Sequence, residues 1–401
     1  MKKVKVAVFS YIDISNLLSG QQRRVNDLLL GLKQEFTVDY IHFSDCADND
    51  KLKLQLAKLG IGYVKLTTGF KGKLSRILIS LIHHLLFPFT GLKKSIFQAG
   101  LSAFHNRDFI RNIDYEIVIA EYFMLSTIFY YTPNRSKKVI DMHDLQVLTL
   151  ESQLDSRRFV PFKKIQILIA RKYEVACLSK SDAVLAVNYN EIDYLRNRIT
   201  SKLIYCPLTI QNYKESNLSK KPPLSVIRLG YFAGLSSKRS YNELKTIIQV
   251  YFNVISLDYP GQIDLLVFGS NPSIKMKELC ITNEVKLLGE THDLTGTFAS
   301  VHFLINYWLE KPYGFRTRII DALSTGTPVI VNSACIDGMK LIKKPGVILC
   351  ENLDDLRSII AHYRANENRY NQLCKEARAT ADIFSPEVIY KNVNREISAL
   401  L

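Results

Sequence analysis

Residues 313–332 read YGFRTRIIDALSTGTPVIVN, and this stretch decides the fold. The spacing of its apolar residues predicts a helix over 317–324, which Gly326 ends, and then a buried strand over 328–332. Gly314 lets the backbone approach a ligand closely, and the N–H groups at the start of the helix point toward the same loop. We therefore expect this loop to bind an anion.

Charged side chains in the same stretch sharpen that expectation. Arg316 and Arg318 add two cations at the start of the helix, and Asp321 follows on the same helix face. The arrangement predicts a diphosphate pocket with one carboxylate that can accept hydrogen bonds from hydroxyl groups. The alternative interpretation is an ordinary helix N-terminus whose arginines are solvated.

Outward from this stretch, short apolar runs alternate with amphipathic helices. Such alternation predicts parallel sheets covered by helices on both faces. It breaks once, in the polar segment 206–224, which is typical of a linker. We predict an α/β fold with two doubly wound domains, over 1–205 and 225–385, and a C-terminal helix over 386–401 that packs back on the first domain. Ligands of such sheets bind at the carboxyl ends of the strands, so a cleft between the domains is expected.

The composition narrows the classes of protein. With 401 residues and 47% hydrophobic residues, the chain is long enough and apolar enough for packed domains, which excludes disorder as its main state. Lys and Arg number 53 against 38 Asp and Glu, so the net charge is +15 and an anionic partner is expected. The seven cysteines are odd in number and contain no CxxC pair, which favours reduced thiols in a cytoplasmic protein.

Several common motifs are missing. The sequence has no G-x-x-x-x-G-K-[ST] phosphate loop, no G-x-G-x-x-G after its first strand and no G-x-S-x-G nucleophile elbow. Asp48-Asn49-Asp50 has the spacing of a metal-binding pair, but it stands just before a predicted helix and is read as a solvated cap.

The stretch from Gly314 onward resembles the retaining nucleotide-sugar glycosyltransferases of the GT-B fold, the large group-one family (family four). Many members carry G-x-R-x-K-x-x-E-A followed by G-x-P-V-V. The present chain reads GFRTRIIDA over 314–322 and GTPVI over 326–330, with Arg for the usual Lys and Asp for the usual Glu. Four further segments resemble family segments more weakly and occur in the same order along the chain. They are SG (19–20), VIDMHD (139–144), LGYFAG (229–234) and VKLLG (285–289).

The resemblance implies two Rossmann-like domains with an interdomain cleft, and transfer of a sugar from a nucleotide-diphosphate donor with retention. It implies a leaving-group site in which the catalytic residues are Arg316, Arg318 and Lys238, and it adds His143 of the first domain as a further catalytic residue near the acceptor. Asp321 is expected to hydrogen-bond the ribose. The other donor-binding residues that it implies are Gly314, Phe315, Thr317, Gly234, Arg239, Gly269, Ser270, Leu288 and Gly289.

The resemblance places the acceptor on the first domain, near Ser19, Gly20 and Glu121. His143 has three interpretations, as a catalytic neighbour, an acceptor contact or a structural histidine. The implied acceptor is a glycan or a lipid-linked glycan of bacterial surface polysaccharide or lipopolysaccharide synthesis. No metal ion and no cofactor other than the donor are expected, because fixed cations already cover the diphosphate.

Two departures from the family keep other functions open. Tyr313 stands where many members have a first Glu, and Leu235 follows Gly234 where many have Arg. A GT-B epimerase or a catalytically degenerate sugar-nucleotide-binding module is therefore the alternative. A nucleic-acid-binding protein is the distant alternative, and no nucleic acid is expected as a partner because no RRM, KH or helix-turn-helix pattern occurs.

Residues 71–97 read KGKLSRILISLIHHLLFPFTGLKKSIF, with apolar residues at helical spacing and lysines and arginines at both ends. This composition predicts an interfacial helix on anionic lipid, so that the protein would lie peripherally on the inner face of the cell membrane. The alternative is a core helix of the first domain with a solvated basic rim.

Overall fold

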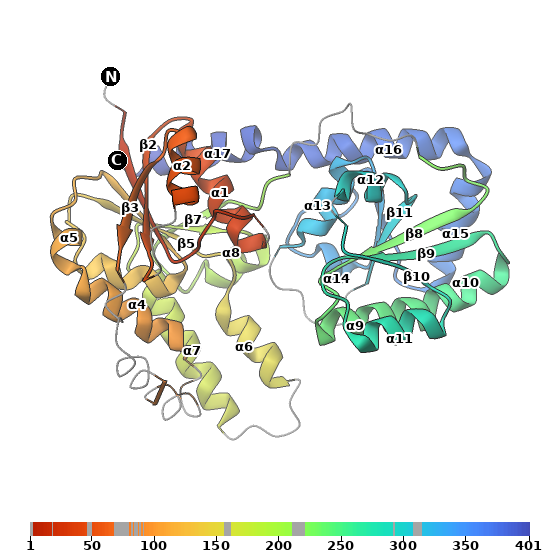
Figure 1. Cartoon of the computed structure of the whole chain (residues 1–401), viewed down its shortest axis with the longest axis horizontal. Helices are drawn as coiled ribbons and strands as arrows, with labels where there is room; N and C mark the ends of the chain where they lie inside the picture. The colour runs from red at the N-terminus through yellow and green to blue at the C-terminus, as the bar shows by residue number, and fades with distance from the viewer. Residues whose placement is uncertain are drawn as a thin grey trace. The chain divides into compact units, whose positions relative to one another are not determined.

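The computed structural model describes residues 3–17, 19–45, 50–67, 92–155, 162–210, 221–291, 293–307 and 315–401, together with residues 80, 81, 83, 87 and 90. The chain forms two compact units, whose elements are labelled in Figure 1. Unit 1 comprises Met1–Leu208, Tyr313–Phe315 and Pro386–Leu401, and unit 2 comprises Thr209–Pro312 and Arg316–Ser385.

Unit 1 is built on a seven-stranded parallel sheet in the order β3-β2-β1-β4-β5-β6-β7. The strands are β1 (Lys5–Ser10), β2 (Thr37–Phe43), β3 (Gly62–Leu66), β4 (Ile117–Glu121), β5 (Lys137–Asp141), β6 (Ala183–Ala186) and β7 (Lys202–Tyr205). Every residue of β4 and β6 is buried, as expected for parallel strands covered on both faces. The strand order reverses between β1 and β4, and the carboxyl ends of strands at such a point are where ligands bind.

Helices cover both faces of this sheet. They are α1 (Gly20–Lys33), α2 (Asp50–Lys58), α4 (Lys94–His105), α5 (Arg107–Arg111), the 3-10 helix η1 (Phe123–Tyr130), α6 (Gln146–Asp155), α7 (Lys163–Leu178), α8 (Tyr189–Leu195) and α17 (Pro386–Ser398). Val6 and Val8 belong to one apolar cluster and Ala7 and Phe9 to another, because successive side chains of a strand point to opposite faces.

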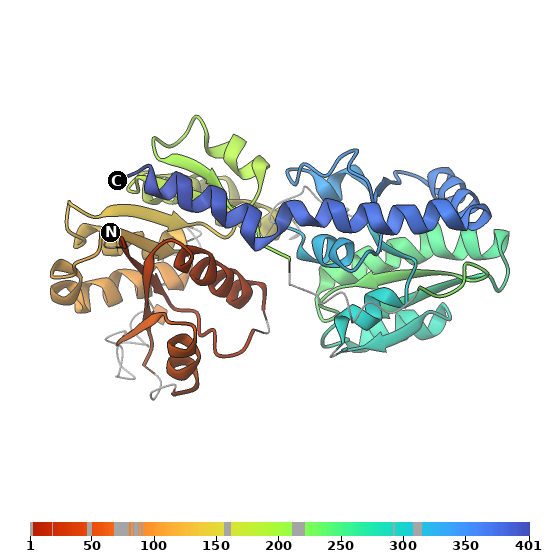
Figure 2. The same cartoon turned by 90° about the horizontal axis from the view of Figure 1, so that it is seen from above.

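Helix α17 packs on α1, as Figure 2 shows with α17 in blue and α1 in dark red. The contact depends on Gly31, because a Cβ atom there would lie 2.0 Å from Cγ of Tyr390. The side-chain amide of Asn394 donates a hydrogen bond to the Gly31 carbonyl at 2.9 Å. The last helix of the chain is therefore part of unit 1.

Unit 2 is built on a six-stranded parallel sheet in the order β10-β9-β8-β11-β12-β13. The strands are β8 (Ile227–Phe232), β9 (Ile263–Phe268), β10 (Lys286–Gly289), β11 (Phe303–Asn306), β12 (Val329–Val331) and β13 (Val347–Leu349). The helices are α9 (Lys238–Thr246), the π-helix η3 (Ile247–Phe252), α10 (Asn253–Asp258), α11 (Ile274–Thr282), α12 (Leu294–Ala299), α13 (Thr317–Ser324), α14 (Ser333–Ile336), α15 (Leu353–Ala365), α16 (Glu367–Ala381) and the 3-10 helix η4 (Asp382–Phe384). The strand order reverses between β8 and β11.

The predicted pair of doubly wound α/β sheets is confirmed. Helix α13 and strand β12 occupy the positions predicted from the 313–332 stretch. Helix α9 begins at Lys238, because the Ser237 hydroxyl accepts a hydrogen bond from the N–H of Ser240 and caps it. Most of the linker, most of the 71–97 stretch, Asp48-Asn49, Tyr313 and Gly314 lie outside the described residues.

Candidate functional site

The predicted donor-binding residues of unit 2 come together at the carboxyl edge of its sheet. Gly234 follows β8, Gly269 and Ser270 follow β9, and Gly289 ends β10. Gly269 has a φ of +140°, and a Cβ atom there would lie 1.8 Å from the Ala233 carbonyl oxygen. Only glycine lets these loops approach each other so closely. The side chain of Leu288 is half exposed beside them.

Three arginines gather at the same edge. Arg316 immediately precedes α13 and is 7% exposed. Its pKa is lowered to about 10, first by burial and then by the positive charges of Arg239 and Arg318. The contributions of Arg239 and Arg318 show that the three cations lie near one another.

One carboxylate, that of Glu243, lies among these arginines. Arg318 donates a hydrogen bond to Glu243 Oε2 at 3.0 Å and another to the Phe232 carbonyl at 3.0 Å. Arg239 Nε lies 3.4 Å from Glu243 Oε1. The hydroxyl of Tyr231 also donates to Glu243, at 3.0 Å. Three guanidinium groups gathered at one edge make the local potential positive, which favours binding of an anion.

The other predicted residues of unit 2 take varied places. Thr317 is the first residue of α13, and Asp321 is buried in the second turn of that helix. Phe315, two residues before α13, belongs to unit 1. Lys238 is exposed and is the first residue of α9.

Sequence reasoning missed two residues at this edge, Glu243 and Asn306. Glu243 follows Arg239 at the i,i+4 spacing of a helical ion pair, which is a signal the sequence does contain. Asn306 ends β11 and is 1% exposed, and neither atom of its side-chain amide has a hydrogen-bond partner among the described residues. A buried amide without partners costs free energy, so Asn306 is a candidate ligand-binding residue.

A charged cluster lies at the carboxyl edge of the unit 1 sheet. Glu121 ends β4 and Asp141 ends β5, and the two residues are paired in register. His143 Nε2 lies 2.5 Å from Glu121 Oε2 and 3.5 Å from Asp141 Oδ2. Arg24 of α1 donates to Asp141 Oδ1 at 2.6 Å and to the Pro207 carbonyl at 2.9 Å. All four side chains are buried.

The ionisation of the cluster follows from its charges. Burial raises the pKa of Glu121 to about 7, and the nearby Asp141 carboxylate adds to the rise. Burial opposes the charged form of His143, but Asp141 and Glu121 outweigh it and raise the pKa of that imidazole. Burial also opposes ionisation of Asp141, yet Arg24 lowers its pKa overall. The cluster therefore balances its own charges.

Two residues of this edge have left-handed backbones, Tyr122 with φ 65° and His143 with φ 59°. Their rings stack with centroids 4.1 Å apart. A residue other than glycine adopts a positive φ only at a cost in free energy. Residues with such a backbone are concentrated at functional sites. The imidazole contacts fit a structural histidine, and a role of His143 in transfer stays a prediction.

Glu121, Asp141 and His143 could also hold a metal ion, because each offers a ligand atom within 4.8 Å of the others. The charged side chains of the cluster do not favour binding of a metal ion. Arg24 already neutralises Asp141, and the raised pKa of His143 keeps a proton on the ring that a metal would have to displace. We therefore treat the cluster as an ion-pair network.

A cavity of about 570 Å³ opens beside the cluster and is lined by Glu121 and Tyr122, together with Tyr11 and Ile12 after β1 and Asp144 after β5. Glu121 Oε1 has no hydrogen-bond partner among the described residues. The predicted residue Ser19 caps α1, since its hydroxyl accepts from the N–H of Gln22 at 3.3 Å, and Gly20 is the first residue of that helix. Of the three residues predicted to lie near the acceptor, Glu121 lines this cavity, whereas Ser19 and Gly20 are not among its lining residues.

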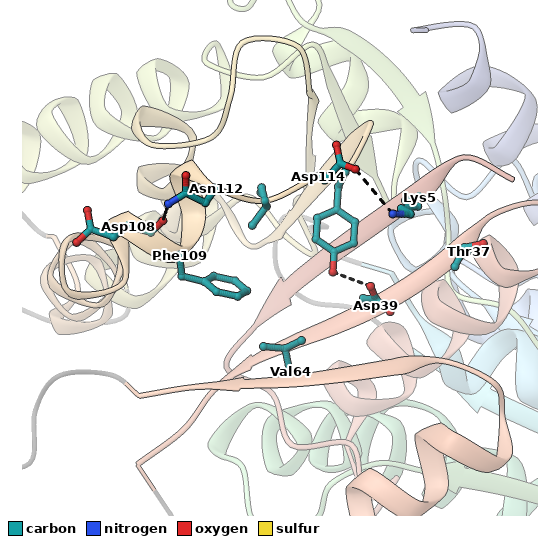
Figure 3. A pocket seen from close by; sticks show the side chains of 10 residues that line it. Lys5, Thr37, Asp39, Val64, Asp108, Phe109, Asn112 and Asp114 are labelled. Carbon is teal, nitrogen blue, oxygen red and sulfur yellow. Dashed lines mark hydrogen bonds and ion pairs between the residues drawn. The ribbon is translucent and has the colours of Figure 1, made fainter. Parts of the chain in front are cut away.

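A second cavity of about 570 Å³ lies at the amino edge of the same sheet. The Tyr115 hydroxyl donates a hydrogen bond to Asp39 at 2.6 Å. Figure 3 shows Lys5 pointing to Asp114, and the two charged groups lie 3.8 Å apart. Its carboxylates thus have partners within the unit. Ligands of parallel sheets bind at the opposite edge, so we place no site here.

Comparison with known proteins extends these observations. No family model matches the chain, and no curated protein matches its sequence. Sucrose-phosphate synthase from Thermosynechococcus elongatus has a similar structure, with a TM-score of 0.67 and 15% identity over 99% of both chains. Anabaena HepE in complex with UDP and glucose matches with a TM-score of 0.60 and 16% identity over 99% of this chain and 100% of that one. The lipopolysaccharide outer core galactosyltransferase WaaB matches with a TM-score of 0.62 and 14% identity, again over 99% and 100%. The chain therefore has the GT-B fold, with two Rossmann-like α/β domains in one polypeptide.

Proposed function

We propose that this protein is a retaining glycosyltransferase that moves a sugar from a nucleotide-diphosphate donor to a glycan or lipid-linked acceptor. Unit 2 binds the donor and unit 1 binds the acceptor. The proposed setting is the cytoplasm, in the synthesis of a bacterial surface polysaccharide or lipopolysaccharide. The fold, the motif from Gly314 to Ile330 and the arginine cluster support this proposal together.

The observation that carries the proposal is the gathering of Arg239, Arg316 and Arg318 at the carboxyl edge of the unit 2 sheet. Sugar transfer releases a nucleoside diphosphate, and negative charge grows on its oxygens as the glycosidic bond to phosphate breaks. Cations fixed in advance where that charge develops lower the barrier. Arg316, Arg239 and Arg318 are held in this way by Glu243 and the start of α13. Because these cations are supplied by the protein, we propose that no metal ion is needed.

Two of the similar structures support the choice of ligands. The HepE structure contains UDP and glucose, and WaaB is a galactosyltransferase of the lipopolysaccharide outer core. We propose a UDP-sugar as the first donor to test. In unit 1, the oxygen Glu121 Oε1 and the adjoining cavity supply a hydrogen-bond acceptor and a space for the hydroxyl of the incoming sugar.

Turnover of a donor panel tests the proposal. UDP-glucose, UDP-galactose, UDP-N-acetylglucosamine and GDP-mannose are each incubated with p-nitrophenyl and octyl glycosides, and release of the nucleoside diphosphate is measured. We expect one donor to be consumed, with a product that NMR shows to retain the anomeric configuration. Inversion of configuration, or absence of both binding and turnover with every donor, would contradict the proposal.

A sugar-nucleotide-binding module without turnover is the second candidate. The specific observation in its favour is that Arg318, in the place of the usual Lys, is engaged by Glu243 and by the Phe232 carbonyl. A cation held this way has less freedom to follow the leaving group. Binding of a donor without release of its nucleoside diphosphate, with any acceptor of the panel, would favour this candidate over the enzyme.

A further inference from the structure

Helix α7 buries two polar side chains among apolar ones and exposes two large apolar side chains. Gln166 and Glu174 lie on the buried face, where Glu174 accepts hydrogen bonds from the backbone N–H groups of Gln146 and Val147. Ile165 and Leu168 lie on the opposite face, and each exposes 49% of its surface. A helix that only packs on its own domain turns its apolar side chains inward. The outer face of α7 is therefore built to meet an apolar environment.

Basic residues share this outer face. Lys164, Leu168 and Lys172 follow one another at i,i+4 spacing, so they form one row along the helix, and both lysines are exposed. Phe162, which precedes the helix, continues the apolar surface and is 52% exposed. The acidic residue of the helix, Glu174, is on the buried side. The outer face thus combines large apolar side chains with positive charge.

Helix α4 of the same unit also exposes large apolar side chains. On α4 the buried residues include Ala99 and Ala103, whereas Leu101 and Phe104 are 44% and 54% exposed. Helices α4 and α7 both pack on η1, and Figure 1 shows them near each other in unit 1. Two adjacent helices of one unit therefore present large apolar side chains to the exterior.

The positive charge of the outer face of α7 indicates what kind of partner binds to it. A second copy of this chain would bring another +15 against the lysines of α7. An anionic lipid surface offers the opposite charge together with an apolar interior, and side chains of this kind insert at the boundary between headgroups and acyl chains. Within the described part of the chain, no helix combines the length and hydropathy needed to cross a bilayer, so contact would be made along the surface.

We propose that the outer face of α7, formed by Phe162, Lys164, Ile165, Leu168 and Lys172, binds the surface of an anionic membrane. The apolar side chains enter the headgroup boundary and the lysines contact lipid phosphates. This inference goes beyond the proposed transfer reaction and holds whether or not turnover is observed. It also rests on residues other than the 71–97 stretch.

Flotation of the full chain with lipid vesicles tests it. One vesicle set is phosphatidylcholine alone and the other contains about one third phosphatidylglycerol, at about 50 mM and about 500 mM NaCl. We expect the protein to float with the anionic vesicles at low salt and to be released at high salt. The double variant Ile165→Gln/Leu168→Gln should lower the partition coefficient at least about tenfold. Lys164→Gln and Lys172→Gln should each lower it about fivefold.

A matched control comes from unit 2, where Val250 and Leu257 are also exposed apolar residues on helical segments. Val250→Gln/Leu257→Gln should float as the wild type does, and circular dichroism should show every variant folded. Wild-type protein that stays unbound at low salt overturns the proposal. So does undiminished flotation of Ile165→Gln/Leu168→Gln. Size-exclusion chromatography that shows a dimer lost only in that variant would assign the face to protein association and also overturn it.

Discussion

The carboxyl edges of the two sheets carry charge in opposite ways. In unit 1, Arg24 and His143 face the carboxylates of Asp141 and Glu121, so the cluster balances its own charges. In unit 2, the guanidinium groups of Arg239 and Arg318 pair with the carboxylate of Glu243, and the positive charge of Arg316 stands close to both. The first arrangement pairs each cation with a carboxylate of the same unit, and we propose that the second binds an anion. The comparison predicts that substitutions in unit 1 mainly change stability and that those in unit 2 mainly change binding.

The largest effect is expected for Arg24→Leu. Removing the guanidinium leaves the fully buried Asp141 carboxylate without its cation, which costs about 3–5 kcal/mol of unfolding free energy. Urea denaturation followed by circular dichroism measures it. Arg135→Ala, which breaks the exposed pair with Asp114, is the control and should cost less than about 1 kcal/mol. Equal losses in the two variants would remove the distinction between buried and exposed pairs.

Arg316→Ala should have the next largest effect, on activity rather than stability. Loss of one fixed cation from the leaving-group site should lower turnover about 10²–10³-fold. The thermal midpoint should stay the same or rise, because repulsion from Arg239 and Arg318 is relieved. Arg357→Ala, at an exposed ion pair with Asp258, serves as the control. Full activity of Arg316→Ala would place the diphosphate elsewhere.

Asn306→Ala and Asn394→Ala compare two buried amides. Asn306 lacks partners among the described residues, whereas Asn394 donates to the Gly31 carbonyl. We expect Asn306→Ala to weaken donor binding about tenfold with little loss of stability, the size of one hydrogen bond. Asn394→Ala should lose about 1–3 kcal/mol of stability and leave donor binding unchanged. Isothermal titration and urea denaturation report the two quantities, and the reverse pattern would contradict the account.

The pH dependence of unit 1 follows from raised pKa values. The pKa of Glu121 rises from its ordinary 4.5 to about 7 on folding, so its stabilising contribution is complete below pH 4.5 and is lost as pH rises through about 7. The raised pKa of His143 acts in the same direction, since its proton is held more tightly in the folded state. Thermal midpoints measured from pH 5 to pH 8 should therefore fall with pH less steeply in Glu121→Gln than in the wild type. Parallel slopes would show that Glu121 does not titrate in this range.

Lys238→Ala should give the smallest effect. Its ammonium is exposed at the start of α9, so solvent screens its attraction for a diphosphate. We expect donor affinity to fall only about two- to fivefold at low salt, and less at high salt. A loss as large as that of Arg316→Ala would shift the centre of the anion site to α9.

The sequence predicted the elements better than the contacts between them. Strand and helix alternation and the 313–332 motif lead to two parallel sheets, because periodicity and the residues that end helices are local properties. The resemblance to the glycosyltransferase family also predicts that Arg239 lies near Arg316. The pairing of Arg24 with Asp141 joins residues 117 positions apart. The lack of hydrogen-bond partners for the Asn306 amide among the described residues depends on which side chains the fold packs around it. Neither leaves a signal in the local sequence.

The central claim is that the arginine cluster of unit 2 binds the diphosphate of a nucleotide sugar. Isothermal titration of wild type and Arg316→Ala with UDP, and with uridine as the matched ligand without phosphates, tests it most directly. The account predicts that UDP binds the wild type, that uridine binds at least about a hundredfold more weakly, and that Arg316→Ala removes most of this difference. Equal affinities for UDP and uridine, or an unchanged preference for UDP in Arg316→Ala, would contradict it.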